Sequence, residues 1–281
     1  MLLLSKDGIF PITKDSEGKL LAKEPATGLS IPGTIQGEGK LAGTPSLFIR
    51  LAKCNLCCIW ELPDKNICRC DTNFTVNSLR NSKIKISDAV NIIKHNLGLL
   101  NHIVITGGEP FIQKKSLTQL IIALKSETNA HITLETNGTL FDINIARNID
   151  LMSISPKLKN SNPTQQKTQL TENKSYTLEL HNKNRLNIEA LQSFIDIANN
   201  HCKDIQFKFV ISSSNDEYEI KDEILSRLNN LSNSDIFVMP LGSTVKELEQ
   251  TSPIAFEMAV KNGWRFSPRL HINLFNNKSK V

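Results

Sequence analysis

Strand-like and helix-like segments alternate along most of this 281-residue chain, and that alternation limits the fold more than any other feature. Apolar runs bounded by turn residues predict strands at residues 46–53, 102–106, 131–135, 151–155, 205–211 and 236–239. Apolar residues at helical spacing predict helices at residues 87–97, 116–126, 188–199, 217–228 and 245–262, with Ser87 as the N-cap of the first and Gly98 as its end. Strands that alternate with helices form parallel sheets, so we predict an α/β fold with functional loops at the carboxyl edge of the sheet.

The chain length fits a single domain over residues 1–281, because α/β barrels commonly reach this size. Residues 1–45 lead toward the first predicted strand through a loop rich in Gly and Pro over residues 25–43. Residues 158–185 are rich in Asn, Gln, Thr and Lys and lack a clear period, which predicts a polar surface insertion. The Asn- and Lys-rich residues 273–281 predict a mobile tail.

Charge and hydropathy exclude several classes of protein. The formal net charge of +5 comes from 33 basic and 28 acidic residues that are interspersed, which does not indicate nucleic-acid binding. The apolar runs fall short of the roughly 18 residues that a membrane span needs. The first residues lack the basic region and the long apolar run of a secretory signal. We therefore expect a soluble cytoplasmic protein that binds neither nucleic acid nor membrane.

Five of the six cysteines lie in one short segment, and only Cys202 stands apart. The five are Cys54, Cys57, Cys58, Cys68 and Cys70, just after the first predicted strand. Such clustering is typical of a metal site and not of a disulfide framework. Thiolates suit zinc as well as iron–sulfur clusters, so the spacing alone leaves the metal open.

Polar clusters follow three of the predicted strands. They are Thr106-Gly107-Gly108-Glu109-Pro110, Glu135-Thr136-Asn137-Gly138-Thr139 and Ser153-Ile154-Ser155-Pro156-Lys157. Two adjacent glycines at a strand end let a ligand approach the backbone closely, and a barrel keeps its active site at these ends. Asn-Gly and Ser-Pro are also common in ordinary turns, so the clusters by themselves do not establish a function.

Taken together, the motifs resemble one enzyme superfamily. Cys54 and Cys58 have the first spacing of the C-x3-C-x2-C pattern of radical S-adenosylmethionine (SAM) enzymes. The surrounding Thr34-Ile35-Gln36-Gly37-Glu38-Gly39, Gly43-Thr44-Pro45, Phe48-Ile49-Arg50-Leu51, Cys54-Asn55-Leu56, Trp60 and Cys70-Asp71-Thr72 resemble its 7-carboxy-7-deazaguanine synthase family. The chain departs from the usual pattern because residues 59–69 separate Cys58 from Cys70, where the common form has two residues. Cys57 and Cys68 therefore remain alternative ligands.

The resemblance implies a fold and cofactors. The fold is a partial (β/α) TIM-like barrel of the radical SAM type, and the cofactors are a [4Fe-4S] cluster, SAM and Mg²⁺. By this resemblance the metal ligands are Cys54, Cys58, Cys70 and, for magnesium, Thr72. The residues implied to contact SAM are Gly108, Glu135, Thr136, Asn137, Ser155, Pro156 and Lys157.

The resemblance also implies a reaction. It is the conversion of 6-carboxy-5,6,7,8-tetrahydropterin to 7-carboxy-7-deazaguanine with loss of ammonia, a carbon–nitrogen lyase step in queuosine and deazaguanine biosynthesis. The implied substrate-binding residues are Ile35, Gln36, Gly37, Arg50 and Thr106, whereas Glu38 serves either the substrate or its own loop. An arginine can pair with a carboxylate through two parallel hydrogen bonds. The implied partners are an electron donor such as flavodoxin or ferredoxin and a second copy in a homodimer.

Two other functions remain open from the sequence. A glycyl-radical activase shares the cluster but has no need of Gln36 and Arg50 as anchors for a small molecule. A zinc-stabilised binding module would use the cysteines without catalysis. Near the end, Met239–Gly242, Gly263–Ser267 and His271 also resemble the deazaguanine family, but the usual Thr-His-Lys is replaced by Leu270-His271-Ile272, so no residue there is assigned a role.

Overall fold

A computed structural model describes residues 1–70, 81–169 and 178–281. Its main sheet has the strand order β12-β11-β10-β9-β8-β7-β3-β1-β6, with β2 paired to β3. The strands from β3 to β12 in this path are parallel, and β1 and β6 add an antiparallel edge. Their bounds are β1 Leu2–Phe10, β2 Thr34–Ile35, β3 Pro45–Leu51, β6 Ser82–Ile84, β7 His102–Gly107, β8 His131–Thr136, β9 Leu151–Ile154, β10 Asp204–Ile211, β11 Ile236–Pro240 and β12 Arg265–Phe266. This open path of parallel strands confirms the predicted partial barrel.

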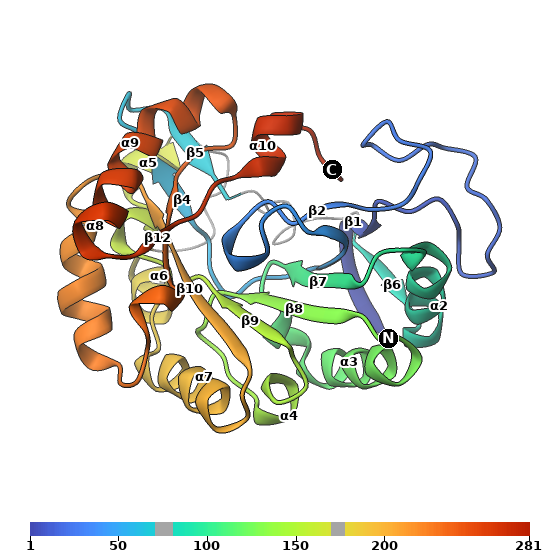
Figure 1. The fold of residues 1–281 in the computed structure, drawn as a ribbon. Helices are drawn as coiled ribbons and strands as arrows, with labels where there is room; N and C mark the ends of the chain where they lie inside the picture. Colours follow the sequence, from blue (N-terminus) through green and yellow to red (C-terminus); the bar gives the residue numbers. More distant parts are fainter. Residues whose placement is uncertain (71–80, 170–177) are drawn as a thin grey trace.

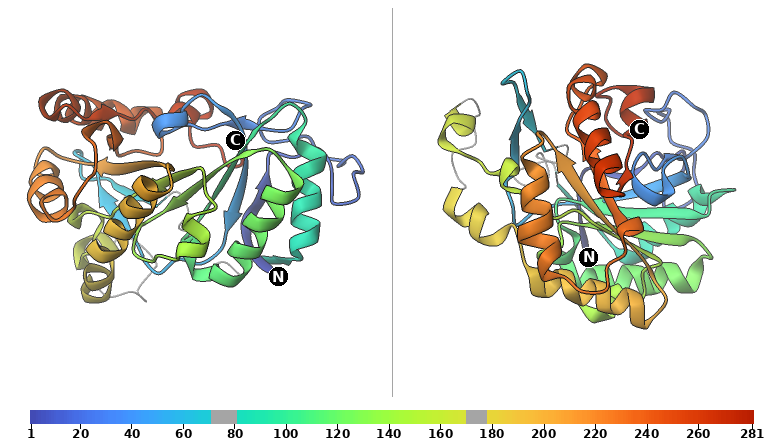
Figure 2. Two further views of the ribbon diagram at one scale, coloured as in Figure 1. Left: turned by 60° about the horizontal axis from the view of Figure 1, so that its bottom comes forward. Right: turned by 60° about the vertical axis from the view of Figure 1, so that its left-hand side comes forward.

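Helices follow most of the parallel strands. They are α2 Ile86–Leu97, α3 Lys114–Glu127, α4 Ile143–Ala146, α7 Ile188–Asn200, α8 Asp216–Tyr218, α9 Val245–Asn262 and α10 Leu270–Phe275. In Figures 1 and 2, α2, α3, α4 and α7 lie side by side along one face of the sheet. The sheet buries its apolar side chains against this layer, where Phe194, Phe207 and Phe209 are fully buried. Truncating such a phenylalanine to alanine costs about 3–5 kcal/mol, so this layer fixes the strands that carry the site.

Most predicted elements are present, with shifts of one or two residues, but three predictions are wrong. Residues 46–53 do not form the first strand, because β1 precedes them and pairs antiparallel with β3. Ser87 does not cap α2; Lys85 occupies that position without a side-chain cap, although Gly98 does end the helix at φ +52°. The predicted helix 217–228 is irregular, since α8 continues into a π-helical turn over Glu219–Ile224 and a 3₁₀ turn over Leu225–Arg227.

Two segments outside the main sheet pack against each other. The first, called here the cysteine hairpin, is residues 54–70, whose strands β4 Ile59–Glu61 and β5 Ile67–Arg69 pair with Trp60 opposite Cys68. The second is the polar insertion, residues 158–185, whose described parts contain the 3₁₀ turn Lys159–Ser161 and the helices α5 Gln165–Gln169 and α6 Leu178–Asn184. Strand β4 contacts both the 3₁₀ turn and α5 of the polar insertion.

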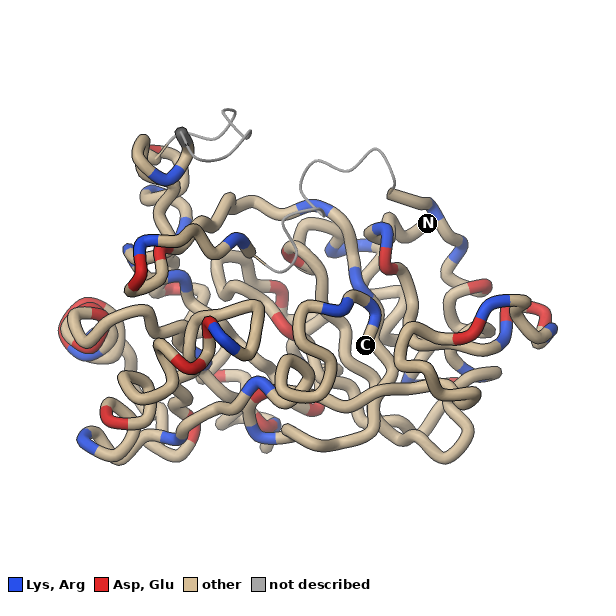
Figure 3. Tube along the Cα trace, turned by 90° about the horizontal axis from the view of Figure 1, so that it is seen from above, with Lys and Arg blue, Asp and Glu red and all other residues tan. Residues whose placement is uncertain are grey.

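Seen from above, Lys and Arg positions are interspersed with Asp and Glu positions over the whole trace (Figure 3). Among the described residues, no helix combines the length and the apolar character that crossing a membrane requires.

Candidate active site

A pocket of about 630 Å³ opens at the carboxyl ends of the parallel strands. It gathers most of the residues that the sequence singled out. They are Ile35, Gln36, Gly37, Arg50, Cys54, Cys58, Cys70, Thr106, Gly108, Glu135, Thr136, Asn137, Ser155 and Lys157. Pro156 is not among the residues that line the pocket, and Thr72 lies outside the described residues. Residues from sequence motifs far apart along the chain therefore share one cavity.

Strand register explains why these motifs meet. Arg50 on β3 lies opposite Thr106 on β7, and Leu51 lies opposite Gly107, so the cysteine segment and the Gly-Gly-Glu-Pro turn leave the sheet side by side. Thr136 on β8 lies opposite Ile154 on β9 in the same way. Because parallel neighbours end at one edge, loops distant in sequence become adjacent there.

The Gly-Gly-Glu-Pro turn joins the site loops through a buried carboxylate. Gly107 has φ +151°, and a Cβ there would lie 2.2 Å from the carbonyl oxygen of Leu51, so only glycine fits. Fully buried Glu109 accepts hydrogen bonds from the Phe111 amide at 3.0 Å, the Thr136 hydroxyl at 2.9 Å and the Asn137 amide at 2.8 Å. Burial raises the pKa of Glu109 to about 7, against the opposing effect of these donors.

Asn55 ties the cysteine segment to the loop after β8. Its Oδ1 accepts a hydrogen bond from Asn137 Nδ2 at 2.9 Å, and its Nδ2 donates to Thr139 Oγ1 at 2.8 Å. Thr139 Oγ1 in turn donates to Asn137 Oδ1 at 2.6 Å. This closed set of side chains orients the backbone next to Cys54.

The cysteines on the pocket wall are all free thiols. Burial raises the pKa of Cys54 to about 12 and that of Cys58 well above its usual range, and the nearby Cys70 raises both further. Cys70 also raises the pKa of Cys57. Cys68 lies in β5, where its Sγ contacts the Arg69 carbonyl oxygen at 3.8 Å.

The donor set fits a cluster better than a single ion. A tetrahedral zinc would draw its thiolate sulfurs to within about 4 Å of one another. Within residues 1–70, 81–169 and 178–281, no three His, Cys, Asp or Glu side chains are grouped to hold one metal ion. A [4Fe-4S] cluster instead places each thiolate on a different iron. Five free thiols line the pocket, Cys54, Cys57, Cys58, Cys68 and Cys70, so enough thiolates are present for that arrangement.

The polar insertion holds the cysteine hairpin through side-chain bonds to its backbone. The ammonium of Lys167 is buried and donates to the carbonyl oxygens of Ile59 at 3.0 Å, Asn160 at 2.7 Å and Asn162 at 3.1 Å. Trp60 Nε1 donates to Asn160 Oδ1 at 3.0 Å. These bonds fix β4, which directly follows Cys58.

A second contact joins the polar insertion to the cysteines themselves. The backbone amide of Cys57 donates to His181 Nδ1 at 3.3 Å. His181 is fully buried, and burial together with Arg185 and Lys157 lowers its pKa to about 4. Arg185 forms a buried ion pair of 2.6 Å with Glu219 and donates to the Lys157 carbonyl oxygen at 2.8 Å.

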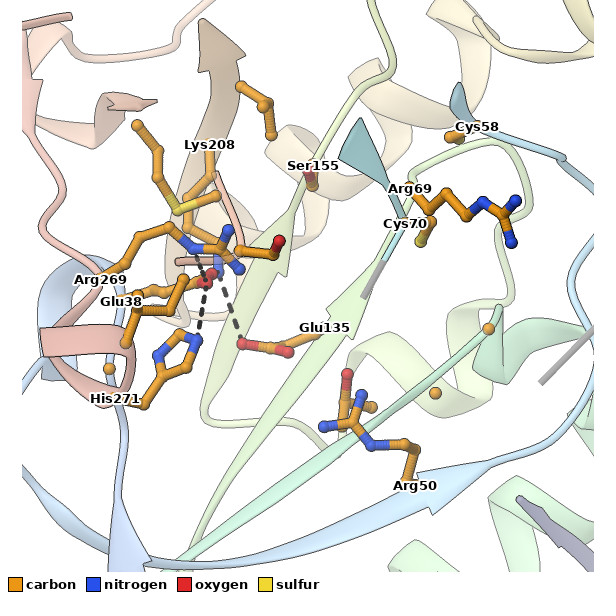
Figure 4. Close-up of a pocket in the computed structure, with 18 of the residues that line it drawn as sticks. Glu38, Arg50, Cys58, Arg69, Cys70, Glu135, Ser155, Lys208, Arg269 and His271 are labelled. Atoms are coloured by element: carbon orange, nitrogen blue, oxygen red, sulfur yellow. Dashed lines mark hydrogen bonds and ion pairs between the residues drawn. The ribbon is translucent and has the colours of Figure 1, made fainter. Parts of the chain in front are cut away.

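The end of the pocket opposite the cysteines carries charged side chains, of which Lys208 and Arg269 are buried. Figure 4 shows Cys58 and Cys70 on one side and Glu38, Lys208, Arg269 and His271 on the other. Lys208 Nζ lies 2.8 Å from Glu38 and 3.4 Å from Glu135, and Arg269 Nε lies 3.1 Å from Glu38. Burial by itself would raise the pKa of Glu38, but Lys208, Arg269 and His271 hold it well below its usual range. Glu38 and Glu135 both line the pocket, where their carboxylate oxygens can accept hydrogen bonds.

Gln36 is already engaged in this network. Its Nε2 donates to Glu135 Oε1 at 3.2 Å, and its Oε1 accepts from the Glu38 amide at 3.1 Å. Gly37 lies against α10, where a Cβ would come 2.0 Å from His271 Nδ1. The loop that carries these residues is thus clamped between β8 and the C-terminal segment, and residues 276–281 line the same pocket.

Asp7, Lys208 and Arg269 are three of the pocket-lining residues that the sequence did not single out. A signal existed for Lys208, because it interrupts the apolar run of predicted strand 205–211. On β10 the side chains alternate, so Lys208 and Val210 face the pocket while Phe207 and Phe209 face the core. No sequence pattern marks Asp7 or Arg269, which reach the site through a strand bulge and a C-terminal turn.

Comparison with known proteins identifies the class. The sequence model of the Radical SAM superfamily matches residues 52–179. A 7-carboxy-7-deazaguanine synthase from Halobacterium salinarum is 31% identical over 86% of this chain and 88% of its own length. One from Rhodopirellula baltica is 32% identical over 86% of this chain and 84% of its own length. A crystal structure of QueE from Escherichia coli, 24% identical, superposes with a TM-score of 0.57 over 84% of this chain and 89% of that chain, which shows a shared fold.

The fold and the pocket are therefore those of a radical SAM enzyme, whose cofactors are a [4Fe-4S] cluster and SAM. The chain belongs to the 7-carboxy-7-deazaguanine synthase family.

Proposed function

We propose that this protein converts 6-carboxy-5,6,7,8-tetrahydropterin into 7-carboxy-7-deazaguanine and releases ammonia, as the names of its relatives suggest. One observation carries the proposal: Arg50 lines the same pocket as Cys54, Cys58 and Cys70. No residue in the described part of the chain accepts a hydrogen bond from the Arg50 guanidinium. Only the Nε of Arg50 has a carboxylate beside it, Asp7 Oδ2 at 3.4 Å, so its two terminal nitrogens are suited to bind the carboxylate of a ligand in the pocket.

We assign the cluster to Cys54, Cys58 and Cys70. We choose Cys70 over Cys68 because Cys70 raises the pKa of both Cys54 and Cys58, whereas the Sγ of Cys68 lies against the Arg69 carbonyl oxygen in β5. Cys57 is the weaker alternative, because its amide is directed to His181 in the polar insertion. When bound, the cluster and SAM supply the radical that removes a hydrogen atom from the substrate. Thr72 stays the proposed magnesium ligand.

The proposed SAM contacts fall into two groups. Gly108, Thr136, Asn137, Ser155 and Lys157 line the pocket, and Lys157 Nζ donates to Ser155 Oγ at 2.7 Å. Their loops leave β7, β8 and β9, next to the loop that carries Cys54. Glu135 and Pro156 complete the proposed set; Glu135 also bonds to Gln36 and Lys208, and Pro156 follows Ser155 without lining the pocket.

For the substrate we propose contacts from Ile35, Gln36, Gly37, Arg50 and Thr106. A pterin ring presents several N–H donors, and the carboxylates of Glu38 and Glu135 offer acceptors for them in the pocket. The Arg50 guanidinium would take the carboxylate, so the ring lies between the two ends of the pocket.

The proposal includes two partners. As a radical SAM enzyme the protein uses a reductant, and we propose a small redox protein such as flavodoxin or ferredoxin for this role. We also propose a homodimer. Both suggestions rest on the family resemblance.

Arg50→Ala tests the proposal. Loss of a buried, charge-assisted pair costs about 2–5 kcal/mol, so turnover of the pterin should fall roughly 30-fold to several thousand-fold. Reductive cleavage of SAM without substrate should persist, because the cysteines are unchanged. Arg147→Ala removes an exposed arginine outside the pocket and should turn over normally. Normal deazaguanine formation by Arg50→Ala would refute the assignment.

A further inference from the structure

The first strand is bulged where it passes the substrate arginine. In the pairing of β1 with β3, Leu4 lies opposite Leu51 and Ile9 lies opposite Ile49, so residues 5–8 all lie opposite Arg50. Gly8 adopts φ +65°, which only glycine adopts without strain. Bulges beside active sites redirect side chains, and this one carries Asp7 into the pocket wall.

Only one of the two carboxylate oxygens of Asp7 is paired with Arg50. Asp7 Oδ2 lies 3.4 Å from Arg50 Nε, and the Asp7 side chain is 4% exposed. Asp7 Oδ1 is buried and has no hydrogen-bond partner in the described part of the chain. An ionisable oxygen buried without a donor is costly, which points to a donor supplied by a ligand.

The arginine beside it is held in one orientation. The Phe10 ring lies against the Arg50 guanidinium with its centroid 5.3 Å from Cζ, and Phe10 itself stacks on Phe48 at 5.5 Å. With Asp7 on the Nε side and Phe10 on one face, the terminal nitrogens remain to bind an anion. The pocket thus presents a fixed cation and a buried acceptor side by side.

We infer that Asp7 is a specificity-determining residue that accepts a hydrogen bond from the N–H group next to the substrate carboxylate. This inference rests on the proposed function. In 6-carboxytetrahydropterin the carboxylate is attached to C6 and the adjacent N5 carries a hydrogen, the arrangement of an α-amino acid. Arg50 and Asp7 complement that pair of groups. In the fully oxidised 6-carboxypterin, N5 carries a lone pair and no hydrogen, so it would face Asp7 Oδ1 acceptor against acceptor.

Binding of the two pterins to reconstituted holoenzyme without reductant tests the inference. The wild type should prefer 6-carboxytetrahydropterin over 6-carboxypterin by roughly tenfold or more. Asp7→Asn can donate to N5 of the oxidised ring, so this preference should collapse to within about threefold. Asp7→Ser provides a second variant of the same kind, because a hydroxyl can donate or accept.

If Asp7 had only a structural role, its substitution would weaken the binding of both pterins by the same factor and leave the ratio of their affinities unchanged. That result would overturn the inference. The preference for carboxylated over decarboxylated tetrahydropterin reports on Arg50 and should survive in Asp7→Asn. The wild type could prefer the carboxylated pterin while Asp7→Asn leaves the preference for 6-carboxytetrahydropterin over 6-carboxypterin unchanged. In that case only this inference fails. If the wild type binds neither pterin, the proposed function fails with it.

Discussion

The edge of the sheet and the cysteine hairpin serve the same pocket but are positioned by different means. At the sheet edge, the loops after β3, β7, β8 and β9 are placed by continuous ladders such as Arg50 opposite Thr106. The hairpin has a ladder only between its own strands, and the polar insertion fixes it through Lys167, Asn160 and His181. The first kind of position follows from strand pattern, whereas the second depends on side chains 100 or more residues away in the sequence.

This difference suggests that the longer cysteine loop and the polar insertion form one unit. The loop departs from the usual family spacing, and the polar insertion supplies the bonds that hold it. Changes at the sheet edge should therefore affect the fold or ligand binding, whereas changes in the polar insertion should affect retention of the cluster.

The largest expected effect separates two cysteines of the hairpin. Cys70→Ala should lose the cluster and all activity, because a thiolate ligand is removed. Cys68→Ala, two positions earlier on β5, should keep both. Iron and sulfide counts on the reconstituted variants measure this. Iron retained in Cys70→Ala together with iron lost in Cys68→Ala would show that Cys68, and not Cys70, is the cluster ligand.

At the sheet edge, two adjacent glycines should behave differently. Gly107→Ala places a methyl group 2.2 Å from the Leu51 carbonyl oxygen and should lower the free energy of unfolding by more than about 3 kcal/mol. Gly108→Ala should leave stability nearly unchanged and weaken SAM binding. Denaturant melts and SAM titrations of both variants check the pair. Equal stability of the two variants would contradict the geometry at Gly107.

Within the polar insertion, Lys167→Met removes an ammonium that satisfies three carbonyl oxygens. Leaving such acceptors unpaired costs about 1–3 kcal/mol, so the cluster should be lost faster to a chelator. Lys159→Met is the matched control, because that ammonium is half exposed and pairs with Glu223 at the surface. Identical rates of iron loss in the wild type and Lys167→Met would show that the polar insertion does not stabilise the cysteine hairpin.

The smallest expected effect is a pH dependence from His181. Burial lowers its pKa from 6.5 to about 4, so as pH falls the unfolded chain binds the proton first. The stability due to neutral His181 is complete above pH 6.5 and is lost toward pH 4, with a slope of at most about 1.4 kcal/mol per pH unit for one proton. In His181→Gln the amide oxygen can still accept from Cys57, and the melting temperature of the cluster-free chain should fall less steeply over this range. If the melting temperatures of the wild type and His181→Gln fell equally between pH 6.5 and pH 4, His181 would not titrate in this range.

The sequence predicted the sheet edge well because its determinants are local. Apolar runs located β7, β8 and β9, and the polar residues directly after them line the pocket as expected. Asp7 and Arg269 could not be found in this way, since a bulge and a turn after β12 bring them to the site from opposite ends of the chain. Lys167 reads as one more lysine in a polar stretch, and only the tertiary contacts show that its ammonium is buried.

The most direct test of the account is one anaerobic incubation. Reconstituted wild-type protein would be mixed with SAM, magnesium, a reductant and 6-carboxytetrahydropterin, and the product mass would be determined. We expect a product with the mass of 7-carboxy-7-deazaguanine, together with release of ammonia. Cleavage of SAM with the pterin recovered unchanged would contradict it, because the pocket would then carry the radical chemistry without this substrate.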